Sequence, residues 1–161
     1  MLEALPRARW SNSYRLLRDG LLLAEIGPAL RCQVDGQAVL GRSRLVRFGR
    51  YGRRLSCLLE VNGRVMAEAQ PRGVGRGWTI VPAGSERAYR LRPRRPLAMT
   101  FVLEEDGILL GTIRPQGRWL WGMRKAVIEL PGLPLPLALF VFWLVITTWH
   151  TQHRDGGGGA M

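Results

Sequence analysis

One stretch of the sequence decides the fold: Leu130-Pro-Gly-Leu-Pro-Leu-Pro-Leu-Ala-Leu-Phe-Val-Phe-Trp-Leu-Val-Ile-Thr-Thr-Trp149, which contains no charged residue. Proline is accepted in the first turn of a helix but not in its interior, so a helix should begin near Pro134 or Pro136 and end near Trp149. Apolar side chains surround this helix on all sides. A helix without a polar face must be buried, either in protein or in lipid.

The length of this helix leaves two environments open. About 14 to 16 residues span about 21 to 24 Å, which is short of the roughly 30 Å hydrocarbon layer of a membrane. Extended residues before the helix could supply the missing depth, so a membrane span over 130–149 remains an alternative. We favour the interior of the protein's own fold, because a barrel of about a dozen strands is too wide for its own side chains to fill.

The rest of the chain predicts antiparallel β hairpins. Asp19-Gly20, Asp35-Gly36 and Asn62-Gly63 each lie between apolar stretches, and Asp106-Gly107 ends a slightly longer turn. Asx-Gly pairs tolerate the positive φ angles that type I′ hairpin turns require. No stretch before residue 130 has a sustained helical period, so we expect a meander of strands.

Three of these hairpins resemble copies of one unit. Their turn glycines Gly20, Gly63 and Gly107 lie 43 and then 44 residues apart. A small residue follows each glycine four places later: Ala24, Ala67 and Gly111. Three copies cannot close a propeller, whereas closing a barrel would remove the exposed strand edges. We therefore predict an all-β fold with one C-terminal helix, as a closed antiparallel β barrel or wrapped meander around that buried apolar helix.

The length of 161 residues suits a single domain with one core. We divide the chain into an N-terminal lead-in, a single β-barrel domain that includes the apolar helix, and a disordered glycine-rich tail. The corresponding ranges are 1–12, 13–150 with the helix at 134–149, and 151–161.

The N-terminus indicates where the chain folds. Glu3, Arg7 and Arg9 interrupt it before an apolar signal segment could form, so we expect a cytoplasmic protein that is peripheral at a membrane. In the alternative with a membrane span, the protein is integral through residues 130–149. Residues 1–129 would then be the cytoplasmic β domain of a tail-anchored, single-pass protein.

The hairpins with weak internal repetition, followed by the apolar stretch Leu133–Trp149 after Glu129-Leu130-Pro131, resemble a known superfamily. It is the tubby-like and phospholipid scramblase-like superfamily, which includes the LURP-one-related proteins. The resemblance is architectural and covers roughly residues 10–150. It implies a closed antiparallel barrel around a hydrophobic C-terminal helix, and a non-enzymatic module associated with acidic phospholipid or membranes. The acidic calcium-binding segment of scramblases has no counterpart, because Glu104-Glu105-Asp106 is too short for a calcium loop.

Arginine dominates the charge of the chain. Lys and Arg number 24 against 12 Asp and Glu, which gives a net charge of +12. Two clusters without any acid contribute most of the excess. The first arginine cluster is Arg42, Arg44, Arg47, Arg50, Arg53 and Arg54, and the second arginine cluster is Arg87, Arg90, Arg92, Arg94 and Arg95.

These clusters suggest a binding function. The planar guanidinium pairs bidentately with phosphate oxygens, so both clusters are candidate sites for anions or lipid headgroups. Phe48 and Tyr51 lie within the first arginine cluster and are candidate membrane-insertion residues. Charge can also serve only to protect strand edges, which is the alternative without a ligand. We expect acidic phospholipid or a membrane surface as the partner, and nucleic acid as a second alternative for which no motif is visible.

Nothing in the sequence indicates catalysis. Cys32 and Cys57 are too few for a zinc knuckle or a disulfide framework, and no Gly-x-Ser-x-Gly nucleophile elbow is present. We therefore expect no enzymatic activity, no metal and no cofactor.

Overall fold

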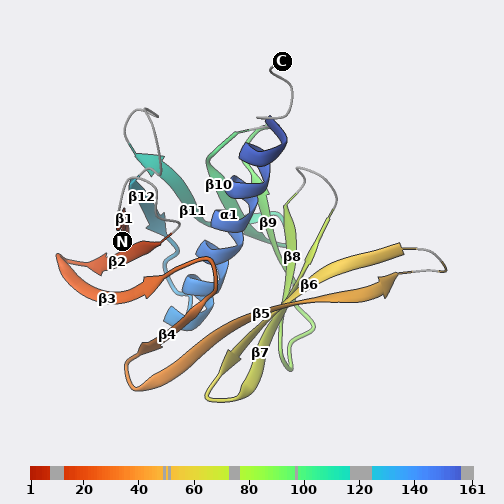
Figure 1. Ribbon diagram of the computed structural model, residues 1–161, viewed down its shortest axis with the longest axis horizontal. Helices are drawn as coiled ribbons and strands as arrows, with labels where there is room; N and C mark the ends of the chain where they lie inside the picture. The colour runs from red at the N-terminus through yellow and green to blue at the C-terminus, as the bar shows by residue number, and fades with distance from the viewer. Residues whose placement is uncertain are drawn as a thin grey trace.

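The computed structural model describes residues 1–7, 13–48, 50, 52–72, 77–96, 98–116 and 125–156. Side chains are described for all of these except Phe48, Arg53, Arg54 and residues 150–156. Within these ranges the chain forms twelve β strands and one α helix (Figure 1). The elements are β1 (Leu2–Pro6), β2 (Tyr14–Arg18), β3 (Leu21–Ile26), β4 (Arg31–Val34), β5 (Gln37–Phe48), β6 (Gly52–Val61), β7 (Arg64–Pro71), β8 (Trp78–Pro82), β9 (Tyr89–Pro93), β10 (Phe101–Glu105), β11 (Ile108–Gln116), β12 (Lys125–Glu129) and α1 (Leu135–Gly156).

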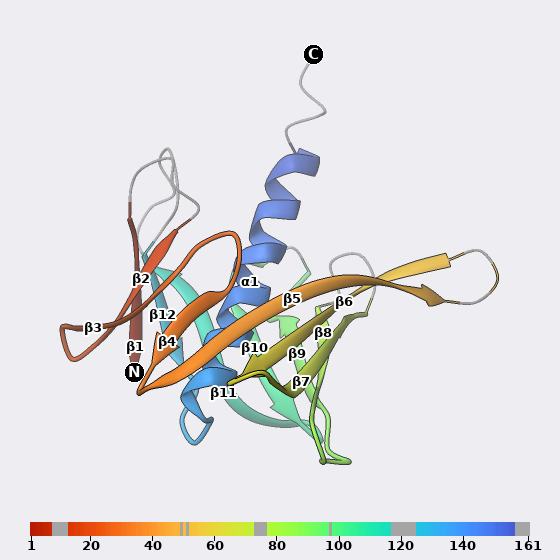
Figure 2. The same cartoon turned by 60° about the horizontal axis from the view of Figure 1, so that its bottom comes forward.

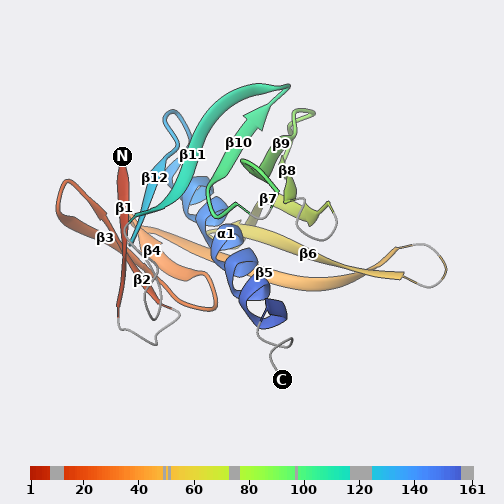
Figure 3. The same cartoon turned by 90° about the horizontal axis from the view of Figure 1, so that it is seen from above.

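The strands form one antiparallel sheet that curls into a nearly closed barrel. Its order is β3-β2-β1-β12-β11-β10-β9-β8-β7-β6-β5-β4, so strands pair with their neighbours in the chain except where β1 joins β12. The edge strands β3 and β4 are consecutive in the chain and lie close together. Seen from above, the strands surround α1 (Figure 3). The predicted fold class is confirmed.

The helix supplies the core of the barrel. Every side chain from Leu137 to Ile146 is buried, and Phe140 and Phe142 are completely inaccessible to solvent. The rings of Phe142 and of Tyr14 on β2 meet edge to face, with 5.3 Å between their centroids. Of the two environments left open by its sequence, the apolar helix occupies the protein interior. Among the described residues, α1 included, no helix combines the length and apolar character that crossing a bilayer requires.

The four Asx-Gly turns lie where the sequence predicts them. The Asx residues have φ between 50° and 52°, and the glycines that follow have φ between 76° and 81°. These are the left-handed angles that a type I′ turn needs at both central positions.

Three hairpins also share a β-bulge. In β2–β3, β6–β7 and β10–β11 the register shifts just after the turn, so that one extra residue lies three places beyond the turn glycine. The extra residues are Leu23, Met66 and Leu110. A small residue follows each of them, and of these Ala24 and Ala67 are buried. A Cβ atom at Gly111 would meet the backbone oxygen of Glu129. A common turn, bulge and small residue support the internal repeat.

The repeat explains the place of β1 in the sheet. Each bulged hairpin is the first part of a repeat unit. The first two units have four strands each, β2–β5 and β6–β9, and the third has only three, β10–β12. β1 takes the fourth place, because it pairs with β12 through Leu2↔Ile128 and with β2 through Ala4↔Leu16. The predicted lead-in over 1–12 is therefore corrected: residues 2–6 are a strand of the barrel wall.

The C-terminal boundary is also corrected. The helix begins at Leu135, as the prolines predict, but it continues to Gly156 rather than ending near Trp149. The apolar run ends at Trp149, yet no helix-breaking residue follows before Gly156. Residues 151–156 are thus helical, and 157–161 of the predicted disordered tail lie outside the described residues.

Because the strands follow one another in antiparallel order, successive connections alternate between the two ends of the barrel. We call the end with the four Asx-Gly turns and the start of α1 the turn end. The opposite end is the loop end, where the β1–β2, β3–β4, β5–β6, β7–β8, β9–β10 and β11–β12 connections lie. The C-terminal half of α1 reaches the loop end (Figure 2).

Candidate anion-binding surface

The first arginine cluster lies on the longest hairpin of the sheet. β5 and β6 pair over ten positions, from Val39↔Val61 to Phe48↔Gly52. β4 pairs only with residues 37–40 of β5, and β7 only with residues 57–61 of β6. The outer part is therefore not paired with any other described strand, and it projects from the barrel (Figure 2). We call residues 44–56 the ribbon.

The ribbon concentrates positive charge. Its 13 positions contain five arginines and no acidic residue. The register places Arg47 directly opposite Arg53, and like charges at opposed positions of a β pair are unfavourable. Leu45 is on the same face as Arg47 and is 64% exposed. The ribbon thus carries both repelling cations and an exposed apolar side chain, and neither contributes to a stable fold.

Four arginines of the two clusters have glutamate partners. Three of the pairs join two strands of the barrel wall, and the fourth joins Arg87, in the β8–β9 connection at the turn end, to Glu105 on β10. The pairs are Arg42–Glu60 at 3.5 Å, Arg44–Glu68 at 3.9 Å, Arg87–Glu105 at 3.5 Å and Arg92–Glu104 at 2.6 Å. We call these four the wall arginines.

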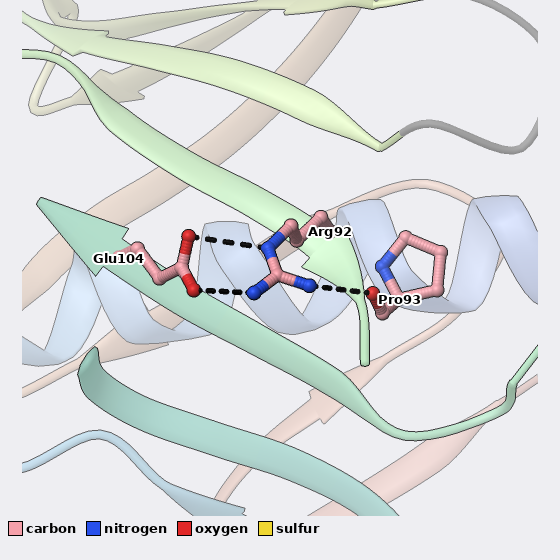
Figure 4. Close-up of polar contacts among 3 residues, drawn as sticks. All are labelled: Arg92, Pro93 and Glu104. Atoms are coloured by element: carbon pink, nitrogen blue, oxygen red, sulfur yellow. Dashed lines mark hydrogen bonds and ion pairs between the residues drawn. The ribbon is translucent and has the colours of Figure 1, made fainter. Parts of the chain in front are cut away.

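The Arg92–Glu104 pair has the best geometry of the four (Figure 4). Arg92 Nε donates to Glu104 Oε2 at 3.1 Å, and Nη2 donates to Oε1 at 2.6 Å. Nη1 donates to the backbone oxygen of Pro93 at 3.3 Å. The hydrogen bonds from Arg92, with its charge and that of Arg90, lower the pKa of Glu104. This guanidinium is committed to the fold and is not available to a ligand.

Four other arginines of the two clusters are exposed at or beyond the loop end and have no such partner. Within the ranges that the structure describes, no carboxylate lies within ion-pair distance of them. They are Arg47, Arg50, Arg94 and Arg95. We call them the unpaired arginines. The fold therefore separates the wall arginines from these four at the loop end, while Arg90 is exposed on β9 without an ion pair to a described carboxylate.

The remaining candidates are placed as follows. Arg90 lies exposed on β9, opposite Glu104 in the register. Arg53 and Arg54 lie on β6 in the ribbon, but their side chains are not described. The candidate insertion residue Phe48 ends β5 without a described side chain, and Tyr51 lies outside the described residues.

Two residues at this surface were not singled out by the sequence. Leu45 is part of the ribbon, and its exposure depends on the absence of a neighbouring strand, which apolar character does not predict. Arg72 follows β7 at the loop end and is exposed. It stands outside both clusters in the sequence, so only the strand topology brings it to the same end as Arg94 and Arg95.

The connection that carries Arg94 and Arg95 is held in place. Arg94 N donates to Thr100 O at 2.8 Å, and Ala98 N donates to Arg95 O at 2.9 Å. The Trp149 indole of α1 donates to Met99 O at 3.0 Å. These bonds attach the connection to the core helix, so its arginines are presented from a fixed backbone.

Other chemistry has little support in the described residues. Burial raises the pKa of the Cys57 thiol to about 11 and also raises that of Cys32, which keeps both thiols protonated at neutral pH. Within the described ranges no group of three or more His, Cys, Asp or Glu side chains could hold a metal ion. The arrangement present is one that can bind anions through guanidinium groups.

No protein-family model, curated protein or solved structure matches this chain. The residues and their arrangement are therefore the basis on which a function is assigned.

Proposed function

We propose that the protein is a non-enzymatic module that binds acidic phospholipid at a membrane surface through its unpaired arginines. The observation that carries the proposal is the contrast between the two sets of arginines. A fold that pairs the wall arginines with glutamate leaves Arg47, Arg50, Arg94 and Arg95 exposed and without carboxylate partners. Phosphate oxygens of a lipid headgroup match the guanidinium fork as glutamate does.

The expected binding free energies are those of reversible attachment to a membrane. A basic residue near an anionic membrane contributes about 1 kcal/mol, so four unpaired arginines contribute about 4 kcal/mol. Leu45 on the ribbon adds an apolar contact, and complete burial of a leucine side chain is worth about 1.5–3 kcal/mol. Together these terms favour peripheral attachment that salt weakens. The resemblance to the tubby-like and scramblase-like superfamily points to the same class of partner.

Vesicle sedimentation tests the proposal. The full-length protein is mixed with vesicles of phosphatidylcholine alone, or with vesicles in which part of it is replaced by phosphatidylserine. We expect the protein to sediment with the anionic vesicles only, and to be released as the salt concentration rises. Equal sedimentation with neutral vesicles at low salt would remove the electrostatic mechanism.

One observation favours nucleic acid as a second candidate. A two-stranded β ribbon fits the major groove of duplex DNA, and the ribbon here carries five arginines on such a framework. This candidate predicts a gel shift of duplex DNA that is lost steeply as salt rises. Retention of DNA without sedimentation on anionic vesicles would replace phospholipid by nucleic acid as the partner.

A further inference from the structure

We infer that the whole loop end, and not the ribbon alone, is the face that docks on an anionic lipid surface, with the turn end directed away from it. This inference rests on the proposed function and extends it. It adds Arg72 to the binding surface and gives the barrel a defined orientation at the membrane.

The connections at the loop end are uniformly basic. Among their described residues, which come from the segments 7–13, 27–30, 49–51, 72–77 and 94–100, every charged side chain is an arginine. They are Arg7, Arg50, Arg72, Arg94 and Arg95. Only Arg7 has a carboxylate partner among the described residues, Glu25 at 3.5 Å. Segments far apart in the sequence thus place cations at one end of the barrel.

The connections at the turn end carry the opposite charge. Three of the four hairpin turns there begin with an aspartate, at Asp19, Asp35 and Asp106, and all three are exposed. The β8–β9 connection contributes Glu86 and Arg87, whose charges offset each other. The connections therefore differ in charge along the barrel axis, and an anionic surface would attract the loop end more strongly than the turn end, where Arg18 and Arg64 flank the acidic turns.

The loop end is also rigidly joined to the core. Three indole groups connect it to α1. Trp143 donates to Pro28 O at 3.1 Å in the β3–β4 connection, and Trp149 donates to Met99 O at 3.0 Å in the β9–β10 connection. Trp78, at the start of β8, donates to the Thr148 hydroxyl at 3.0 Å. Arg94 and Arg95, on the β9–β10 connection, are thus held close to the core helix before a ligand arrives, which lowers the entropic cost of binding.

The form of this surface favours an extended ligand over a single small anion. Its cations lie on separate connections and on a projecting ribbon, so they do not surround one point. A cavity of about 460 Å³ lies at the turn end instead, where Arg18 and Glu129 are among its lining residues and no loop-end arginine is. A flat array of lipid headgroups is therefore the ligand that several loop-end arginines can contact together.

A pair of double variants with equal charge tests the inference in the full-length protein. The loop-end variant is Arg94→Gln with Arg95→Gln, and the turn-end variant is Arg18→Gln with Arg64→Gln. All four arginines are exposed and have no carboxylate partner among the described residues. A third variant, Arg72→Gln, tests whether Arg72, which lies outside both arginine clusters, belongs to the binding surface. Circular dichroism and thermal unfolding establish that each variant is folded.

Affinity for vesicles containing phosphatidylserine is the measured quantity. We expect it to fall about 30-fold in the loop-end variant and about fivefold for Arg72→Gln, given the usual contribution of a basic residue at an anionic membrane. We expect the turn-end variant to stay within about twofold of the wild type, since its arginines lie beyond the screening length of the docked face.

Three results would overturn the inference. Equal losses in the two double variants would show that net charge alone matters, and unchanged affinity in the loop-end variant would confine docking to the ribbon. In both cases the wild type still binds, so the binding of acidic phospholipid stands although the docked face does not. If the wild type binds no anionic vesicle, or binds duplex DNA instead, the proposed function fails and the inference fails with it.

Discussion

The barrel wall and the loop end use the same side chain in different ways. In the wall, arginines such as Arg92 face a glutamate on another strand, and their charge is balanced within the fold. At the loop end, arginines such as Arg47 and Arg94 are exposed and form no ion pair with a described carboxylate. We therefore expect stability and anion binding to reside in separate regions. Substitutions in the interior and wall should change stability and leave binding intact, whereas substitutions at the loop end should do the reverse.

The largest effect on stability is expected in the interior. Phe142 on α1 is completely buried and lies between Tyr14 and Trp149, with ring centroids at 5.3 and 6.5 Å. Phe142→Ala should lower the free energy of unfolding by about 3–5 kcal/mol, because the barrel cannot collapse onto the cavity left in its centre. Chemical denaturation measures this loss. A change below about 1 kcal/mol would contradict the role of α1 as the core of the barrel.

A smaller loss is expected in the wall at Gly111. A Cβ atom there would meet the backbone oxygen of Glu129, which cannot move without disturbing the end of β12. Gly111→Ala should therefore cost about 1–3 kcal/mol. Ala67→Gly, at the equivalent place in the second repeat, is the control and should cost about 0.5–1 kcal/mol. If both variants unfold at the same denaturant concentration, the close packing at Gly111 is not a constraint.

The Arg92–Glu104 pair should have a modest effect on stability and none on binding. Glu104→Gln removes the charge that balances Arg92 and should lower the free energy of unfolding by about 1 kcal/mol. Affinity for anionic vesicles should not decrease, since no unpaired arginine is altered. Reduced vesicle affinity in this variant would contradict the expectation that wall residues affect stability and not binding.

The Arg92–Glu104 pair should also make the free energy of unfolding depend on pH. Because Arg92 lowers the pKa of Glu104 in the folded protein, the ionised carboxylate stabilises the fold. This stabilisation is complete above the ordinary value of 4.5 and is lost as the pH falls through the lowered pKa. The difference in unfolding free energy between wild type and Glu104→Gln should therefore shrink below pH 4.5. A difference that is constant from neutral to acidic pH would exclude this contribution.

The smallest effect on stability is expected at the tip of the ribbon. Arg50→Gln alters an exposed side chain without a described partner, so the free energy of unfolding should change by less than about 0.5 kcal/mol. Affinity for anionic vesicles should nevertheless fall about fivefold. Unchanged affinity in this variant would remove the tip of the ribbon from the binding surface.

Local signals in the sequence were sufficient for much of the fold. An Asx-Gly pair requires only its own backbone angles, so the four turns could be placed from the sequence. Pro134 and Pro136 likewise locate the start of α1. The strand β1 could not be predicted, because Leu2 finds its partner at Ile128, far along the chain. The continuation of the helix to Gly156 was missed because an apolar run marks burial rather than the end of a helix.

The candidate site was predicted less completely. The close spacing of arginines in the sequence identifies the two arginine clusters, but it does not distinguish Arg92 from Arg94. Which of them has a partner depends on strand register, since Glu104 reaches Arg92 only through the pairing of β9 with β10. The place of Arg72 depends on the alternation of connections between the two ends, which requires the number and order of all strands.

The most direct test compares two quadruple variants that lose the same charge. In one, the unpaired arginines Arg47, Arg50, Arg94 and Arg95 are replaced by glutamine. In the other, the wall arginines Arg42, Arg44, Arg87 and Arg92 are replaced. We predict that affinity for anionic vesicles falls about a thousandfold in the first, from about 1 kcal/mol for each arginine, and only a few-fold in the second. Equal losses in the two variants would contradict the division of the arginines between fold and binding.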